Sequence, residues 1–509
     1  MSPIIRILPS LRRAALVCAL PFILIPSAAA TQERYDVVLQ GGRVMDPETG
    51  LDAIRNVGIR GQTVVAISAA ALSGDVVVDV SGMVVAPGFI DLHAHGQTNR
   101  ANEFQAMDGV TTALELEGGM PDVASYLKGR RGNSVLNFGA TMSHGAARMW
   151  VMPNYAPEVA QVKALLKELT TREPTLEEML TMGTALDASR YDALEKDQYP
   201  ALRARLREGL AEGAIGIGMP HQYYPGANRD EIYRVFEMAG NEQIPIYTHV
   251  RSMGIDAMQE VIANAVATGA PLHIVHVNSM SLWDIQTNLD LITGAQAAGV
   301  DVTTEAYPYT AASTTIGSTI FDEGWQERLQ ISYGDLQWQE TGERLTEATF
   351  NEFRARDGVI IIHLMKPEWI SSAMSAPNVM VASDGMPYAP GAHPRSAGTF
   401  ARFLGKYVRD EGVLTLMEGL RKITLMPAQR LETISPQMHR KGRLQIGSDA
   451  DVTVFDPARI IDTATFDGDL TYSEGVKFVL VNGQFVVRDG EVVTGARPGQ
   501  AVVGRLVVF

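Results

Sequence analysis

The stretch that most constrains the fold is Ala86-Pro-Gly-Phe-Ile-Asp-Leu-His93-Ala-His95, an apolar run that ends in two histidines. On a β-strand, side chains at positions i and i+2 point to the same face. His93 and His95 are therefore expected to converge at the end of a buried strand, where two imidazoles suit a metal ion. A solvated loop with two histidines is the alternative. It is disfavoured because later apolar strands also end in histidine or a carboxylate.

The middle of the chain alternates apolar strand-like runs with segments of helical periodicity, which predicts an α/β fold, a (β/α)8 barrel of the TIM type. Catalytic residues of such barrels gather where the strands end. A polar segment over residues 316–358 is expected to form a lid-like insertion with Trp325, Tyr333 and Trp338 over the site. The expected strands are Val84–His95, Thr111–Glu117, Val135–His144, Ala214–Met219, Pro245–Val250, Leu272–Asn278, Val302–Tyr309 and Val379–Asp384.

Both flanks of this region consist of short β-type runs separated by turns, over residues 31–86 and 435–509. They predict a small β-sandwich built from both chain ends around a barrel of residues 87–434. Two separate β modules are the alternative, and the pattern leaves that alternative open.

Residues 1–30 have the features of a bacterial-type signal peptide, with three early arginines, an apolar run and a small-residue cleavage site at Ser27-Ala-Ala-Ala30. The apolar run is too short for a membrane anchor, so we expect an exported protein, periplasmic or secreted, with no stable membrane span after cleavage. The single cysteine, Cys18, lies inside this segment, so the mature chain has no thiol ligand. A formal net charge of −15 argues against nucleic acid as a partner.

The strand ends supply histidines and carboxylates, which together suit Zn²⁺ or a similar divalent ion. Glu115 and Glu117 share one strand face, and Glu117, nearer the strand end, is the preferred ligand, while Glu115 is expected to form an internal salt bridge. A carboxylate can bridge two ions, so one or two metals are expected. The candidate metal ligands are His93, His95, Glu117, His249 and His276.

Asp384 follows the last strand and precedes Gly385, which makes it the candidate catalytic acid/base, with a simple turn-forming role as the alternative. His273 is assigned a structural role. Four further histidines are predicted to be core residues rather than ligands, although they are candidates for supporting the site: His144, His221, His363 and His393.

The chain resembles the amidohydrolase superfamily and, within it, the N-acyl-D-amino-acid deacylases, which include D-aminoacylases and N-acyl-D-glutamate deacylases. The resemblance covers nearly all of the expected mature chain. Besides the first histidine pair, its motifs are Gly109-Val-Thr-Thr, Thr248-His249-Val-Arg251, Glu305-Ala-Tyr307-Pro-Tyr309 and His393-Pro-Arg395. The last two blocks are far more specific than the histidine pair, which marks only the superfamily.

The resemblance implies a metal-dependent hydrolase that cleaves N-acyl-D-amino acids, possibly N-acyl-D-glutamate, to a carboxylate and a free D-amino acid. It assigns one metal to the first histidine pair and another to His249 and His276, with Asp384 as the acid/base for a metal-activated water. It further implies that Tyr307 and Ser313 hold the substrate carboxylate.

Two departures from the family pattern concern the metal and the substrate. Glu-Leu-Glu-Gly-Gly, residues 115–119, stands where typical D-aminoacylases place a metal-binding cysteine, as in the N-acyl-D-glutamate subgroup. Asn278 stands where a carboxylate-binding lysine is expected, so Arg251 or Arg395 is a candidate substitute.

The sequence supports other functions of the same fold less well. Dihydroorotases and hydantoinases are expected to carry a carboxylated lysine on the fourth strand, and residues 214–219 contain none. A dipeptidase or another exported amidase would use the same site with a different pocket. A non-catalytic scaffold would be expected to lack a metal ligand or Asp384, and here all are present.

Overall fold

A computed structural model describes residues 1–4 and 34–508, and the residues from Arg34 onward form one compact unit. The predicted signal peptide, apart from its first four residues, lies outside the described part of the chain. Within the described residues, no helix is both long enough and apolar enough to cross a membrane.

The predicted barrel is confirmed as an eight-stranded sheet with every adjacent pair parallel. A parallel bridge between Ala94 and Gly385 joins its first and last strand regions, and the Gly96 amide donates to the Gly385 carbonyl at 2.9 Å. The carboxyl ends of all eight strands therefore surround one point. The strands are β6 (Phe89–Asp91), β7 (Val110–Met120), β8 (Asn137–Ser143), β9 (Ile217–Pro220), β10 (Ile246–His249), β11 (Leu272–Ile274), β12 (Val302–Ala306) and β16 (Val379–Val381).

A helix that packs directly on the barrel strands buries an apolar stripe, as α7 illustrates. Asn228 caps its first turn through the Glu231 amide, and Ile232, Val235 and Phe236 repeat at helical spacing and are fully buried. The helices are α1 (Asn99–Met107), α2 (Val123–Arg130), α3 (His144–Val151), α4 (Ala156–Glu168), α5 (Leu176–Leu186), α6 (Tyr199–Ala211), α7 (Arg229–Glu242), α8 (Ile255–Thr268), α9 (Val277–Ser281), α10 (Ile285–Ala297), α11 (Trp325–Leu329), α12 (Glu347–Arg356), α13 (Pro367–Ser375), α14 (Arg395–Arg402), α15 (Leu416–Ile423) and α16 (Leu425–Leu431).

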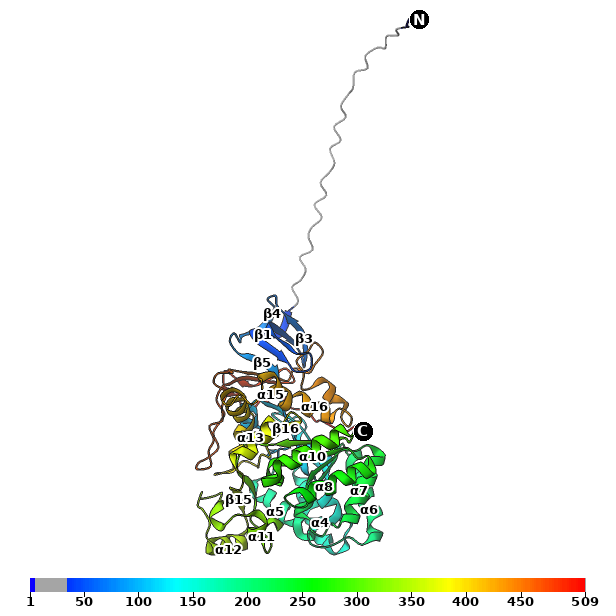
Figure 1. The fold of residues 1–509 in the computed structure, drawn as a ribbon, viewed down its shortest axis with the longest axis vertical. Helices are drawn as coiled ribbons and strands as arrows, with labels where there is room; N and C mark the ends of the chain where they lie inside the picture. The colour runs from blue at the N-terminus through cyan, green and yellow to red at the C-terminus, as the bar shows by residue number, and fades with distance from the viewer. Residues whose placement is uncertain (5–33, 509) are drawn as a thin grey trace. The chain divides into compact units, whose positions relative to one another are not determined.

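The two chain ends meet in one nine-stranded sheet, because β5 pairs antiparallel with β17. Side chains from both halves, such as Leu39 and Leu480, share one apolar core. This excludes two separate modules, while the exact boundaries at 86/87 and 434/435 remain predictions. The strands are β1 (Arg34–Asp46), β2 (Leu51–Arg60), β3 (Thr63–Ser68), β4 (Ser73–Asp79), β5 (Val84–Pro87), β17 (Val452–Phe455), β18 (Val476–Val481), β19 (Gln484–Arg488) and β20 (Glu491–Val492), several of which are labelled in Figure 1.

The predicted insertion folds around a small antiparallel sheet of β13 (Ala312–Thr315), β14 (Leu336–Trp338) and β15 (Val359–Ile362). Figure 1 shows α11, α12 and β15 of this insertion close together. Its aromatic residues pack mainly on one another: Trp325 stacks on Phe350 at 5.3 Å and Trp338 on Phe353 at 4.4 Å, centroid to centroid. They belong to the same apolar core as the barrel residues, and Trp338 also lines a cavity that His95 lines. The lid-like role of the insertion stays a prediction.

A second excursion separates β8 from β9 and was not anticipated as such. It contains α4 and α5, which pack on each other through Leu166 and Leu186. Thr175 caps α5 through the Glu178 amide. The place of α5 beside the carboxyl ends of the strands comes only from the tertiary structure.

Candidate metal and catalytic site

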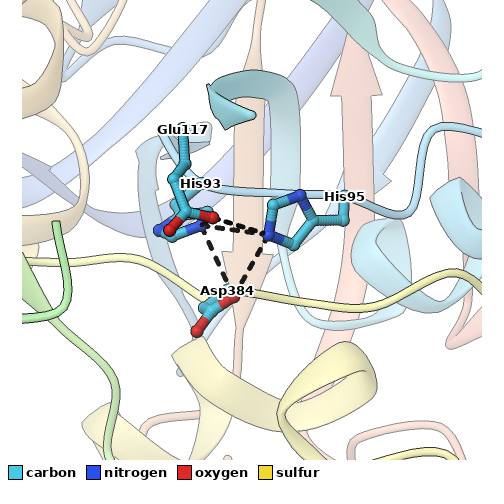
Figure 2. A group of neighbouring side chains, drawn as sticks. All are labelled: His93, His95, Glu117 and Asp384. Carbon is cyan, nitrogen blue, oxygen red and sulfur yellow. Dashed lines mark hydrogen bonds and ion pairs between the residues drawn. The ribbon is translucent and has the colours of Figure 1, made fainter. Parts of the chain in front are cut away.

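Four side chains converge at the carboxyl end of the barrel: His93, His95, Glu117 and Asp384 (Figure 2). Glu117 Oε2 lies 3.1 Å from His93 Nε2 and 3.2 Å from His95 Nε2. Asp384 Oδ1 lies 3.4 Å and 3.3 Å from the same two nitrogens. Two imidazole nitrogens and two carboxylate oxygens within this span form a donor set suited to a divalent metal.

The other oxygen of Glu117 faces a second histidine pair. Glu117 Oε1 lies 2.7 Å from His249 Nδ1 and 3.3 Å from His276 Nε2. Glu117 thus belongs to both groups of candidate ligands, with one oxygen directed to each. This is the arrangement that a carboxylate needs in order to bridge two ions.

Carboxylates orient the first histidine pair. His93 Nδ1 lies 2.9 Å from Glu305 Oε1, and His95 Nδ1 lies 2.7 Å from Glu115 Oε2. An Nδ1–H that donates to a carboxylate leaves Nε2 as the free lone pair, which both rings present to Glu117 and Asp384. Glu115 is thereby placed behind the site as a partner of His95, and Glu117 stands between the two histidine pairs.

Within the described chain, no carboxylate contacts the outer ring nitrogens of the second histidine pair, His249 Nε2 and His276 Nδ1. His249 Nε2 lies 2.6 Å from the amide oxygen of Gln222, and His276 Nδ1 has no hydrogen-bond partner among the described residues. His276 adopts a left-handed backbone conformation with φ of 31°, which is uncommon for a residue other than glycine. Its backbone amide is held by Glu305 Oε2 at 2.8 Å, so Glu305 supports both histidine pairs.

Buried charges of opposite sign shift the pKa values of these groups. Burial alone would raise the pKa of Glu117, but His93, His249 and His276 hold it well below its usual range. Burial would lower the pKa of His93, yet the carboxylates of Asp384 and Glu117 raise it well above its ordinary value. Such a concentration of buried carboxylates requires cations beside it.

Asp384 is presented to the site by a strained turn after β16, with φ of 50°. The preceding Ser383 fixes this turn, since its hydroxyl donates to buried Asp91 at 2.5 Å. Asp384 Oδ2 forms an ion pair with Arg395 Nη1 at 2.9 Å. Burial would raise the pKa of Asp384, but Arg395 and His93 lower it, so its carboxylate is ionised at neutral pH.

A cavity of about 260 Å³ opens beside the donor groups and includes Tyr307 and Ser313 in its wall. The hydroxyls of both residues are buried and have no hydrogen-bond partner among the described residues. The Arg395 guanidinium lies 4.7 Å from the centre of the Tyr307 ring, behind this wall. Two free hydroxyls backed by a cation can receive a ligand carboxylate.

The structure does not bring Arg251 into this group. Its guanidinium pairs with both oxygens of Glu260, at 3.0 Å and 2.9 Å, and donates to the Ala227 carbonyl. Arg251 is a candidate only as a substitute for the lysine that the family resemblance implies, and it lies beyond the end of β10 at His249. Asn278 is also turned away, donating to the Tyr307 carbonyl at 3.1 Å.

The other histidines have structural partners. His273 reaches Glu305 Oε2 at 3.5 Å from behind the site, and His393 accepts from the Arg395 amide at 3.0 Å. The remaining three contact residues outside the donor group: His144 pairs with Glu231, His221 lies near Thr248, and His363 lies near Gln337.

Sequence reasoning gave no role to Glu305 and did not consider Gln222. For Glu305 a signal existed, namely a carboxylate at the end of a predicted strand two residues before Tyr307. Gln222 follows β9 in a short 3-10 turn, and nothing in its neighbourhood marks it as a partner of His249.

Comparisons with known proteins identify the family of the chain. The profile of the family described as "Amidohydrolase family" matches residues 76–487. An N-acyl-D-glutamate deacylase of Alcaligenes xylosoxydans xylosoxydans is 30% identical over 479 residues, covering 89% of this chain and 93% of the relative.

Two solved structures share the fold over 92% of this chain and 100% of their own. One is the N-acyl-D-glutamate deacylase of Bordetella bronchiseptica complexed with zinc and a phosphonate that mimics the tetrahedral intermediate, with a TM-score of 0.76 and 24% identity. The other is a D-aminoacylase described for its binuclear metal centre, with a TM-score of 0.76 and 25% identity. The chain belongs to the amidohydrolase family.

Proposed function

We propose that the protein is a zinc-dependent deacylase that hydrolyses the amide bond of N-acyl-D-amino acids to a carboxylate and a free D-amino acid. One observation carries the proposal: Glu117 directs one oxygen to each of two histidine pairs, and Asp384 stands beside the first pair. The activities of the relatives, D-aminoacylase and N-acyl-D-glutamate deacylase, support the substrate class.

The residues present fit zinc. Their donor atoms are imidazole nitrogens and carboxylate oxygens. In His93, His95 and His249 one ring nitrogen is bound by Glu305, Glu115 or Gln222, which leaves the ring nitrogen that faces Glu117 free for a metal. His93, His95, Glu117 and Asp384 would hold one ion, and Glu117, His249 and His276 a second. When bound, zinc lowers the pKa of a water molecule towards neutrality and polarises an amide carbonyl.

Asp384 is the proposed general base and acid. Its carboxylate is ionised, so Oδ1 takes the proton of the attacking water and then returns it to the nitrogen of the leaving amine. Arg395 holds Oδ2 at 2.9 Å and so fixes the direction in which Oδ1 points. Asp384 is 8% exposed, and the shielding from solvent strengthens each electrostatic contact in the site.

The substrate carboxylate is proposed to bind the hydroxyls of Tyr307 and Ser313, with the charge of Arg395 behind them. For the substrate side chain, no lysine or arginine is among the described residues that line the smaller cavity. Met253, Met280 and Leu364 line it instead. These contacts favour a neutral D-amino acid over D-glutamate, whose second carboxylate would lose its hydration without gaining a cation.

A panel of substrates tests the proposal on the zinc-loaded protein: N-acetyl-D-methionine, N-acetyl-D-glutamate, their L enantiomers and a hydantoin. We expect amine release from the D-methionine substrate, about tenfold or more above the D-glutamate substrate, and none from the hydantoin. Activity confined to the hydantoin or the L forms would overturn the substrate assignment. The hydantoinase alternative lacks support because β9 carries no lysine and none of the described lysines lines the cavity.

We also propose that the protein acts after export, on the basis of the signal-like residues 1–30. Fractionation of cells that express the full chain, with mass spectrometry of the new N-terminus, tests this. An N-terminus intact at Met1 in the cytoplasmic fraction would contradict it.

A further inference from the structure

A second, larger cavity of about 810 Å³ meets the smaller one at the donor groups. His95 and Gly118 line both cavities, as do Thr315 and Met386 on the opposite side. A substrate whose amide bond lies at the donor groups can therefore extend into both cavities, with one half in each. The hydroxyls of Tyr307 and Ser313 line only the smaller cavity, which assigns the amino-acid half to it.

The wall of the larger cavity is strongly apolar where the excursion between β8 and β9 forms it. Leu166 of α4 and Leu176, Met179, Leu180 and Met182 of α5 contribute to it. Leu176 and Leu180 are 37% and 39% exposed. Although α5 is described in full, none of its side chains is buried. A helix with this many unburied leucines and methionines at a cavity indicates an apolar ligand.

Charged side chains of the same wall are already engaged within the protein. Glu115 pairs with His95, and Asp187 pairs with Arg190 at 3.5 Å. The three arginines of the wall each have a glutamate partner: Arg130 with Glu173, Arg172 with Glu178, and Arg356 with Glu340. A polar or charged ligand would have to displace these partners, whereas an alkyl chain would not.

We propose that the acyl half of the substrate is a long, unbranched alkyl chain that occupies the larger cavity, so that the enzyme cleaves N-(fatty acyl)-D-amino acids. The inference rests on the proposed deacylase function and names its acyl group. An acetyl group would leave most of the 810 Å³ unfilled, while cavities of ~300–1,000 Å³ commonly enclose much larger ligands.

Chain-length dependence tests the proposal. N-acetyl-, N-octanoyl- and N-lauroyl-D-methionine are compared on the zinc-loaded protein, and kcat/KM is expected to rise at least about tenfold from acetyl to octanoyl, because each buried methylene adds binding free energy. A flat or falling series with the acetyl compound cleaved would overturn the acyl inference and leave the deacylase function intact. Failure of all three compounds would instead overturn the deacylase function.

Two variants and a matched control test whether the alkyl chain of the substrate binds beside α5. Leu176→Glu and Leu180→Glu place a charge on half-exposed positions of α5 in the cavity wall, and each is expected to remove most of the octanoyl-to-acetyl ratio of kcat/KM. Val266→Glu makes the same change at a 62% exposed position on α8, away from both cavities, and is expected to have no effect. An octanoyl advantage that survives in both α5 variants would overturn the placement.

Binding without catalysis gives an independent readout. Laurate titrated into the metal-free protein by calorimetry is expected to bind, and Leu180→Glu is expected to weaken it about tenfold or more. No heat with wild-type protein, or equal affinity in the variant, would overturn the cavity assignment whatever the activity measurements give.

Discussion

Some buried polar groups at the carboxyl ends of the barrel strands lack hydrogen-bond partners among the described residues, whereas at the amino ends the partners of buried Asp451 are in place. At the carboxyl ends, His276 and Asp384 adopt left-handed backbone conformations, and the hydroxyls of Tyr307 and Ser313 have no hydrogen-bond partner within the described chain. At the amino ends, buried Asp451 accepts from Lys441 Nζ at 2.7 Å, from Asn137 at 2.9 Å and from the Asn482 amide at 2.7 Å.

The difference separates groups kept for chemistry from groups kept for folding. Unpaired hydroxyls and strained turns destabilise a fold, and they occur where a ligand would complete their contacts. A buried ion pair with all partners in place, such as Lys441 with Asp451, joins the barrel to the sheet made by the chain ends. The same residue types should therefore give different losses when they are altered at the two ends.

The largest expected effect is at the carboxyl ends. Asp384→Asn removes the proposed proton acceptor and should lower turnover by about 10²–10⁴-fold. Asp384 is one of the proposed ligands of the first ion, but the histidines and Glu117 remain, so zinc content by elemental analysis should fall far less than turnover. Asp301→Asn, an aspartate just before β12 at the amino ends, is the matched control and should keep its turnover. Equal rates for wild type and Asp384→Asn would refute the assignment.

The next effect is at the amino ends and concerns folding. Lys441→Met leaves the 3% exposed Asp451 without its cation and should lower the free energy of unfolding by about 3–5 kcal/mol. Turnover of the folded fraction should not change. Lys128→Met, at an exposed position on α2, should stay within about 0.5 kcal/mol in the same denaturant titration. A stable Lys441→Met protein would remove the contrast between the two ends.

A smaller effect is expected from the support of the metal ligands. Glu305→Gln keeps the shape of the side chain but removes the charge that faces His93 Nδ1, and should weaken zinc binding about 10–100-fold in competition with a chelator. Gln222→Leu removes the neutral partner of His249 and should weaken zinc binding less than Glu305→Gln does. The reverse order would contradict the view that the charge of Glu305 supports the metal ligands more than the neutral amide of Gln222 does.

The last effect is a pH dependence at the amino ends, and it is the smallest when counted per pH unit. Lys422 Nζ donates to the Met374 and Ala376 carbonyls just before β16, and burial lowers the pKa of Lys422 to about 7 from its usual 10.5. Between these values the unfolded chain holds a proton that the folded chain lacks, so stability falls as pH decreases from 10.5 to about 7 and then levels off.

The comparison that isolates this group is wild type against Lys422→Met. Their difference in unfolding free energy should change by at most ~1.4 kcal/mol per pH unit between pH 7 and 9.5, in favour of wild type as pH rises. A difference that does not vary with pH would mean that Lys422 keeps its proton in the folded protein.

Sequence patterns predicted the parts of the site that depend on local geometry. The i, i+2 relation paired His93 with His95, and position at a strand end selected Glu117, His249, His276 and Asp384 for the group that the structure brings together. Arg251, a candidate taken from the family resemblance, is not brought into the group, because the strand ends at His249 and α8 supplies Glu260 as its partner. Local periodicity stops being informative where regular structure stops.

The sequence by itself determined the barrel and the identity of the donor groups, because strand periodicity and strand-end residues are local properties. The pairing of β5 with β17 in the structure decided that both chain ends form one β unit. Only the tertiary structure decided which residues support the donor groups. Glu305 contacts His93 across 212 positions, and α5 forms a cavity wall with residues from the insertion. Such contacts depend on how distant segments pack against each other, and the sequence pattern of neither segment predicts them.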